Sequence, residues 1–251
     1  MSGPSTDAGA PPRATAITLA AIGDLHVTEH DEHQYRDLFA EMSDAADVAA
    51  LCGDLTNFGK VREAERLAED LKSLTIPTVA VLGNHDVEAS ETEEVLRILE
   101  QAGVTMLDEQ ATVIEGVGFA GVIGFLGGFG RGELGAFGED AIKAFVDETR
   151  NEARKLENAL RSLRTERVVA VLHYAPIAET VEGEPLEIYP FLGSSRLAYA
   201  IDRFDNVKAV VHGHAHRGRY QGATSRGVPV YNCARFVVEE AHGRPYALLE
   251  I

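Results

Sequence analysis

Short apolar runs, each too short to form a helix, recur along the chain between longer stretches of mixed character. Polar residues rarely interrupt these runs, which is typical of strands that are buried on both faces of a sheet. The predicted strands are Ala16–Ile22, Asp47–Leu51, Pro77–Leu82, Val168–Leu172 and Val207–Val211. The pattern therefore predicts a sheet that other elements cover on both sides.

Hydrophobic residues spaced three and four apart predict helices between the strands. These helices span Tyr35–Met42, Ala64–Leu74, Val95–Ala102 and Ile142–Leu163. The last is the longest, with about 25 residues and a length of roughly 38 Å. The first elements alternate as βαβαβα, which predicts an α/β fold with a partly parallel sheet.

Shorter β-type segments occupy the middle and the end of the chain. The middle segments are Val104–Leu107, Thr112–Ile114 and Gly118–Ile123. The final segments are Val228–Tyr231, Phe236–Val238 and Tyr246–Ile251. We expect the final three to be strands that add antiparallel pairs to the sheet.

Two long loops and an N-terminal tail lie outside this pattern. Gly124–Gly138 holds seven glycines and three phenylalanines, and Tyr174–Arg196 carries three prolines. Loops of this length are usually functional or disordered, and each is a candidate to shape a substrate pocket or a dimer contact. Residues 1–15 are rich in Pro, Gly, Ser and Ala and predict a disordered tail, which leaves 16–251 as a single domain.

Each of the five apolar runs named above is followed by residues that can bind a metal ion. In chain order these residues are Asp24, His26, Asp54, Asn84, His173, His214 and His216. In open α/β sheets the binding edge lies at the carboxyl ends of the strands, so these side chains are expected to meet there. Seven oxygen and imidazole ligands exceed the needs of one tetrahedral zinc ion and suit two divalent ions that share a carboxylate.

The motifs Asp-x-His, Gly-Asp, Gly-Asn-His-Asp, His and Gly-His-x-His follow one another in this order. This set resembles the calcineurin-like metallophosphoesterase superfamily, and the resemblance extends from Thr18 to about Tyr231. It implies a four-layer αββα sandwich, in which two mixed β-sheets are flanked by helices. An α/β fold of this kind agrees with the element order above.

The resemblance also assigns ligands to each of two metal ions. The first ion would be held by Asp24, His26 and His216. The second ion would be held by Asn84, His173 and His214, and Asp54 would bridge the two. His212 lies two residues before His214, and we expect it to support the site from the core rather than to bind metal.

A hydrolytic mechanism follows from two such ions. Cations about 3.5–4 Å apart bind the oxygens of a phosphate ester and lower the pKa of a shared water toward about 7, so that a metal-bound hydroxide attacks phosphorus in line. His85 resembles the family's active-site histidine, and we expect it to protonate or stabilise the leaving group. Asp86 is expected either to orient the His85 imidazole or to cap the next turn. Carboxylate, amide and imidazole ligands accommodate Mn, Fe or Zn.

The composition limits the partners of the protein. Its 40 acidic and 23 basic residues give a formal charge of −17, which disfavours nucleic-acid polymers and anionic membrane surfaces. No apolar run approaches 18 residues, and Met1–Ala16 lacks the pattern of a signal peptide. Two cysteines do not make a disulfide framework, so we expect a cytoplasmic protein. The sequence leaves the oligomeric state open, a homodimer included.

Together these features predict an enzyme that hydrolyses a small phosphate ester. Protein serine/threonine phosphatases of the superfamily have Gly after the first histidine and Gly-Asn-His-Glu, whereas this chain has Val27 and Gly-Asn-His-Asp. What remains resembles bacterial-type phosphodiesterases, so a phosphodiester is the favoured substrate. Two alternatives stay open: a phosphomonoesterase of the same fold, and a non-hydrolytic metal-binding scaffold that docks a partner. The presence of His85 argues against a scaffold.

Overall fold

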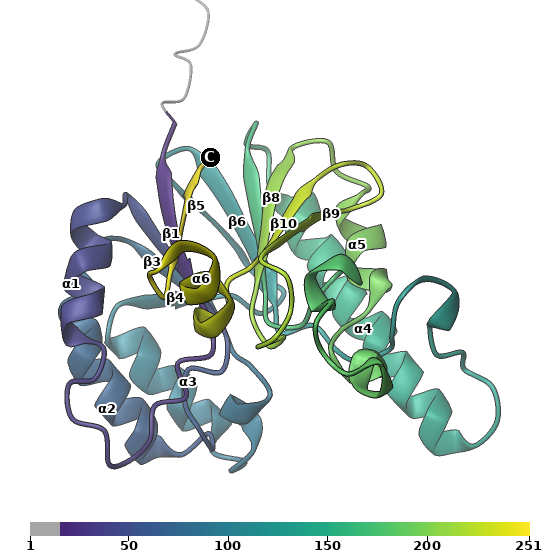
Figure 1. Ribbon diagram of the computed structural model, residues 1–251, viewed down its shortest axis with the longest axis horizontal. Helices are drawn as coiled ribbons and strands as arrows, with labels where there is room; N and C mark the ends of the chain where they lie inside the picture. The colour runs from purple at the N-terminus through teal and green to yellow at the C-terminus, as the bar shows by residue number, and fades with distance from the viewer. Residues whose placement is uncertain (1–15) are drawn as a thin grey trace, which may run out of the picture.

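Two β-sheets lie face to face between two layers of helices in the computed structural model (Figure 1). The structure describes residues 16–251. The predicted disordered tail over residues 1–15 therefore lies outside the described residues. The four layers confirm the predicted αββα sandwich.

The first sheet has the strand order β11-β1-β2-β3-β4. Four of its strands run parallel to one another. They are β1 (Thr18–Ile22), β2 (Val48–Cys52), β3 (Thr78–Val81) and β4 (Val104–Met106). The strand β11 (Ala247–Glu250) pairs with β1 in the antiparallel sense, as expected for the last segment of the chain.

The second sheet has the order β5-β6-β7-β8-β10-β9. These strands are β5 (Ala111–Ile114), β6 (Val117–Val122), β7 (Val168–Leu172), β8 (Val207–His212), β9 (Gln221–Ala223) and β10 (Pro229–Asn232). The strands β6, β7, β8 and β10 are parallel, and β5 and β9 form antiparallel edges. The expected antiparallel pairing of β10 is confirmed for its contact with β9. It is wrong for the contact with β8, which is parallel.

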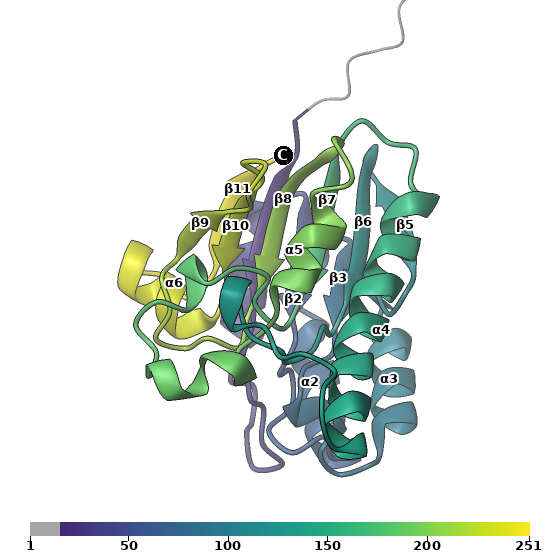
Figure 2. The same cartoon turned by 90° about the vertical axis from the view of Figure 1, so that its right-hand side faces the viewer.

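Helices cover the outer face of each sheet. The first sheet is covered by α1 (Arg36–Ala45), α2 (Val61–Leu71) and α3 (Thr92–Gln101). The second sheet is covered by α4 (Asp140–Ser162) and α5 (Ser195–Ile201), which run along its outer face in Figure 2. With 23 residues, α4 has close to the predicted length.

Alternation along the strands places side chains in two different cores. In β1, Leu19 and Ala21 pack between the two sheets, whereas Ala20 and Ile22 face the helices and contact the core that contains Phe39. All of these side chains are buried. Burying a large apolar side chain contributes about 1.5–3 kcal/mol, so both faces of the strand stabilise the sandwich.

The segment Phe236–Val238 is helical and not a strand, which corrects the prediction from sequence. It belongs to α6 (Arg235–His242), and Gly243 ends this helix in a left-handed conformation with φ of 70°. Val238 packs into the core between the sheets, while Phe236 stays 42% exposed. Tertiary packing of two adjacent valines overrides their intrinsic preference for strands.

Both long loops contain short 3₁₀ turns. The glycine-rich loop holds η2 (Gly130–Gly132), and the proline-containing loop holds η3 (Glu179–Val181) and η4 (Leu186–Phe191). Among residues 16–251, no helix combines the length and the apolar character needed to cross a bilayer.

Candidate metal centre

The parallel strands of both sheets end at a common edge, where the predicted ligands meet. Three groups of side chains have potential ligand atoms within 4.8 Å of one another. The groups are Asp24 with His26 and His216, Asp54 with His26 and His85, and Asp54 with His173 and His214. The structure therefore brings together six of the seven predicted ligands and His85, and Asn84 joins them through a contact to His173 described below.

Four of these residues have backbone conformations in the left-handed region, which non-glycine residues rarely adopt. The φ angles are 61° for Asp24, 49° for His26, 50° for Asp54 and 71° for His214. Each costs about 1–3 kcal/mol, and such residues concentrate at active sites and ligand clamps. The sharp turn lets the chain leave a strand end while its side chain points back to the shared edge.

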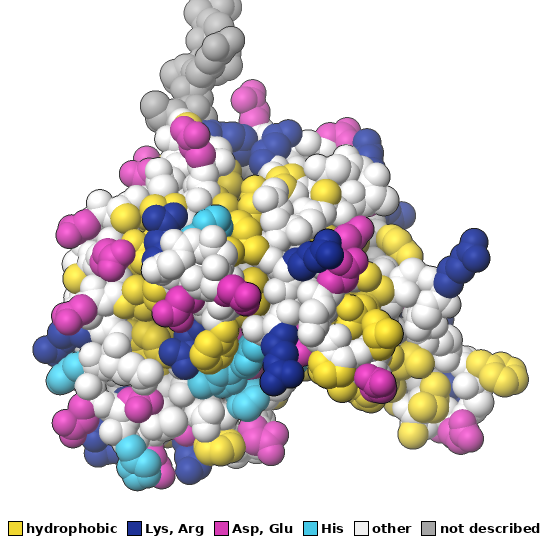
Figure 3. All heavy atoms as spheres, in the orientation of Figure 1, with side chains coloured by type: hydrophobic (Ala, Val, Ile, Leu, Met, Phe, Trp, Pro, Cys, Tyr) yellow, Lys and Arg dark blue, Asp and Glu magenta, His cyan; other side chains and the backbone are white. Residues whose placement is uncertain are grey.

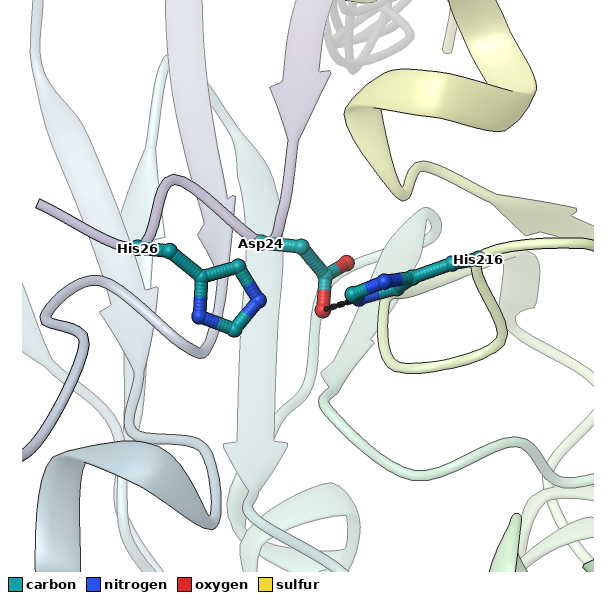
Figure 4. Close-up of side chains that lie close together, drawn as sticks. All are labelled: Asp24, His26 and His216. Atoms are coloured by element: carbon teal, nitrogen blue, oxygen red, sulfur yellow. Dashed lines mark hydrogen bonds and ion pairs between the residues drawn. The ribbon is translucent and has the colours of Figure 1, made fainter.

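Asp24, His26 and His216 form the first group, with the carboxylate of Asp24 between the two imidazole rings (Figure 4). The His216 Nε2 atom lies 3.0 Å from Asp24 Oδ1, and the backbone N–H of His214 donates to both Asp24 oxygens at 3.0 Å. Both ring nitrogens of His26 are buried and have no hydrogen-bond partner. Leaving such atoms unpaired is costly, and a bound metal ion would satisfy one of them.

Asn84 lies beside the group formed by Asp54, His173 and His214, in contact with His173. The Nδ1–H of His173 donates to the Cys52 carbonyl over 3.0 Å, which leaves a lone pair on Nε2 of the neutral ring. This Nε2 lies 2.9 Å from Asn84 Oδ1 and 3.4 Å from Asp54 Oδ1. Three lone-pair atoms that converge in a buried place fit a cation, which would remove their mutual repulsion.

A backbone carbonyl orients His214 in the same way. Its Nε2–H donates to the Phe191 carbonyl over 3.0 Å, so its Nδ1 is the atom free to bind a metal. Burial lowers the pKa of His214 to about 4 and also lowers the pKa of His26. Both rings are consequently neutral near pH 7, which is the protonation state that metal binding requires.

Asp24 and His216 shift each other's pKa toward the charged forms. Burial raises the pKa of Asp24, but the hydrogen bond from His216 and the neighbouring imidazoles outweigh it, and the net shift is downward. Burial lowers the pKa of His216, yet the hydrogen bond and charge of Asp24 outweigh this, and the net shift is upward. A cation bound to Asp24 would favour its ionised form further.

His85, which belongs to the group with His26 and Asp54, is held at both its backbone and its ring. Its backbone N–H donates to Asp54 Oδ1 over 2.9 Å, and its Nδ1–H donates to the Asn57 carbonyl over 2.7 Å. The ring centroid of His85 lies 4.6 Å from that of His26 in an edge-on arrangement. The remaining nitrogen, Nε2, is the one free to act on a substrate.

Asp86 does not orient the His85 ring, which corrects one of the two roles expected for it. Its fully buried carboxylate accepts from the backbone N–H groups of Leu55, Thr56 and Gly83 and from the Thr56 hydroxyl, over 2.6–3.1 Å. Burial and the charge of Asp54 raise its pKa to about 6. Asp86 thus caps the turn that carries Asn84 and fastens it to the loop after β2.

His212 supports the site from the core, as expected. It is fully buried, with Nε2 2.8 Å from the Thr180 hydroxyl and Nδ1 2.8 Å from the Gly213 carbonyl. Sequence reasoning missed Phe236, whose ring centroid lies 5.2 Å from that of His216, because its segment was expected to be a strand. It also missed the carbonyls of Asn57 and Phe191, which no side-chain pattern can reveal.

Residues 17–218 match the family described as Calcineurin-like phosphoesterase. The match spans most of the chain, so the chain belongs to the calcineurin-like phosphoesterase family. Membership, together with the cluster of carboxylate and imidazole groups, makes it a metal-dependent phosphoric ester hydrolase.

Two curated relatives resemble the chain over most of their length. An uncharacterised protein of Methanocaldococcus jannaschii is 27% identical over 181 residues, which cover 71% of this chain and 73% of the relative. A 3′,5′-cyclic-nucleotide phosphodiesterase of Nostoc sp. is 22% identical over 218 residues, which cover 80% of this chain and 72% of the relative.

Solved structures share the fold. Phosphopantetheinyl hydrolase from Mycobacterium tuberculosis superposes with a TM-score of 0.64 at 14% identity, covering 93% of this chain and 95% of that one. The protein TT1561 of Thermus thermophilus superposes with a TM-score of 0.54 at 17% identity, covering 94% and 99%. At these identities the likeness shows the arrangement of the two sheets and their helices and nothing finer.

Proposed function

We propose that this protein hydrolyses a small phosphodiester with the help of two metal ions at the clustered strand ends. One observation carries the proposal: the two oxygens of Asp54 face different histidines. Its Oδ2 lies 3.8 Å from His26 Nε2, and its Oδ1 lies 3.4 Å from His173 Nε2. A carboxylate between two sets of imidazoles fits a bridge between two cations.

The ligands divide between the ions as the family resemblance implies. Asp24, His26 and His216 would hold one ion, Asn84, His173 and His214 the other, and Asp54 would bridge them. Two bound cations supply charge to the phosphate oxygens and a water acidic enough to attack phosphorus near neutral pH. Mn, Fe and Zn all suit this mixed ligand set, and availability in the cell decides among them.

His85 would protonate the leaving group. Hydrolysis consumes one water, breaks the bond from phosphorus to the leaving oxygen, and delivers a proton to that oxygen. The Asn57 carbonyl accepts the hydrogen bond from Nδ1–H of His85, so the imidazolium form of the ring, with a second proton on Nε2, would donate that proton to the leaving oxygen. A positioned imidazole of this kind contributes about 10²- to 10⁴-fold when the leaving group is a poor one.

Two observations support a small diester over a long polymer. The relative from Nostoc carries the name of a cyclic-nucleotide phosphodiesterase, and cyclic nucleotides are small phosphodiesters. A formal charge of −17 repels an extended polyanion, whereas two divalent ions concentrate positive charge at a single point. The cytoplasmic location and the homodimer stay predictions from the sequence.

An activity profile tests the proposal. The protein loaded with Mn²⁺ is assayed with bis-p-nitrophenyl phosphate, p-nitrophenyl phosphate and 3′,5′-cyclic nucleotides. We expect turnover of diesters to exceed turnover of the monoester, and chelation to abolish both. A faster monoester would replace the proposal with a phosphomonoesterase. Two bound ions without turnover of any ester would leave a non-hydrolytic scaffold.

A further inference from the structure

A cavity of about 550 Å³ opens directly beside the metal ligands. At one end it is lined by Asn84, His214 and His216, so whatever occupies it touches the metal centre. The rest of the lining comprises the charged residues Glu184 and Arg217 and an apolar wall, which is formed by Leu126, Tyr174, Ile188, Phe191 and Leu192. Volumes of about 300–1,000 Å³ enclose drug-sized ligands, so the cavity has room for more than a phosphate group.

Part of this wall is exposed to water although it is strongly apolar. Phe191 is 54% exposed and Ile188 is 38% exposed, and both belong to η4. Figure 3 shows hydrophobic side chains next to the exposed histidines on this face of the molecule. Apolar patches that border a polar site mark places where ligands or partners bind.

The apolar wall is attached to the metal centre through the backbone. The carbonyl of Phe191, whose side chain lines the cavity, accepts the Nε2–H of His214 over 3.0 Å. The backbone N–H of Ala175 donates to the Leu192 carbonyl over 3.0 Å. The backbone N–H of Gly127 donates to the Pro190 carbonyl over 2.9 Å. These contacts fix the distance between wall and ligands, so the cavity is preorganised for a molecule that spans both.

Close backbone approach holds the same segment in place. A Cβ atom added at Gly193 would lie 1.9 Å from the Ala175 carbonyl oxygen, and φ at Gly193 is 159°. Only glycine fits this approach, which brings the end of η4 against the loop that follows His173. The wall is therefore a built part of the site.

We infer that the cavity selects phosphodiesters with a large apolar substituent, which lies against Ile188 and Phe191 while the phosphate lies at the metal ligands. This inference rests on the proposed function and adds the class of substrate. A polyhydroxylated substituent in the same position fits less well, because the side chains of Ile188 and Phe191 have no polar atom. Its hydroxyl groups would lose water without finding new hydrogen bonds.

A series of diesters with one leaving group tests the inference. The compounds are the p-nitrophenyl phosphates esterified with a methyl, a phenyl or a 2,3-dihydroxypropyl group. We expect the phenyl ester to have a KM at least about tenfold below that of both others, with a similar kcat, because its ring leaves water. Equal KM values across the series would overturn the inference and leave the proposed function intact.

Two substitutions locate the effect. Ile188→Ala removes an exposed side chain that lines the cavity, and we expect it to raise KM for the phenyl ester severalfold more than for the methyl ester. Leu186→Ala is the matched control, because Leu186 lies on the same 3₁₀ turn, is 75% exposed and does not line the cavity. An equal loss in both variants would contradict the assignment.

A binding measurement keeps the test independent of turnover. Phenylphosphonate and methylphosphonate are titrated calorimetrically into the Mn²⁺-loaded protein, since neither has an ester bond to break. We expect phenylphosphonate to bind at least about tenfold more tightly and Ile188→Ala to reduce the difference. Equal dissociation constants would overturn the inference even if no ester is hydrolysed, whereas a preserved preference without hydrolysis would refute the proposed function alone.

Discussion

The ring of His85 is held by the backbone of Asn57, with Nδ1 of the histidine 2.7 Å from the carbonyl oxygen. This contact places a proton on Nδ1 and fixes the direction of the ring, because a carbonyl oxygen can accept a hydrogen bond but cannot donate one. The neighbouring carboxylate of Asp86 is occupied by four other donors. His85 can therefore offer Nε2 to a substrate without depending on an adjacent acid.

His85→Ala should slow esters with poor leaving groups most. Phenolate needs a proton more than p-nitrophenolate does, so we expect about a 10²-fold or greater loss for diphenyl phosphate and a clearly smaller loss for bis-p-nitrophenyl phosphate. The rates of both esters are compared at saturating Mn²⁺. His30→Ala serves as the control, since the side chain of His30 is 88% exposed, and it should change neither rate. Equal losses in His85→Ala on the two esters would exclude the role in protonation.

Asp54→Asn should cost both bound metal and rate. The amide keeps the size of the carboxylate but loses its charge, so it no longer bridges two cations. We expect the variant to retain at most one ion per chain and to lose at least about 100-fold in rate on bis-p-nitrophenyl phosphate. Metal content is measured by mass spectrometry, with the exposed Asp44→Asn as the control. Two retained ions with wild-type rate would remove Asp54 from the bridge.

Asp86→Ala should destabilise the fold rather than act on chemistry alone. It leaves the buried donors of Leu55, Thr56 and Gly83 without an acceptor, and each buried unpaired group costs about 1–3 kcal/mol. We expect a loss of at least about 3 kcal/mol in the free energy of unfolding of the metal-free protein in urea. Asp86→Asn keeps one acceptor oxygen and should lose less. A loss below about 1 kcal/mol in Asp86→Ala would show that the fastening is unimportant.

Glu152→Gln should show that the native Glu152 side chain lowers the free energy of unfolding as the pH rises. Burial raises the pKa of Glu152, despite its ion pair with Lys155 and the hydrogen bond from the Gly124 N–H. Between the unfolded and the raised folded pKa, the folded state binds more protons, so native stability falls as pH rises. Glutamine does not titrate, and the variant should gain stability relative to the native protein from pH 4.5 to 7.5. Urea unfolding with chelator checks this, and a relative loss would contradict the raised pKa.

The clustering of the proposed ligands could be predicted from the sequence, because it depends on which side chains follow the strands and on the order of the strands. Asp24 and His214 lie 190 residues apart, yet each follows a parallel strand, and parallel strands share a carboxyl edge. The spacing rule needs only the order of polar residues after apolar runs. The bounds of β7 were also predicted without error, because its apolar run is uninterrupted and buried on both faces.

Other features escaped because backbone or packing decides them. The carbonyls of Asn57 and Phe191 orient two histidines, but any residue at those positions has the same carbonyl. Phe236 looked like part of a strand because it precedes two valines, and its packing in α6 was not visible. The apolar wall at Ile188 depends on a loop whose shape is set by Gly193 and by contacts to distant segments.

In the proposed function, two metal ions held by residues from five strand ends are needed to hydrolyse a phosphodiester. The most direct measurement is a titration of the metal-free protein with Mn²⁺, in which bound metal per chain and the rate on bis-p-nitrophenyl phosphate are followed together. We expect the rate to stay low with one ion and to reach its plateau at two ions per chain. A plateau at one ion, or two bound ions without hydrolysis, would contradict this expectation.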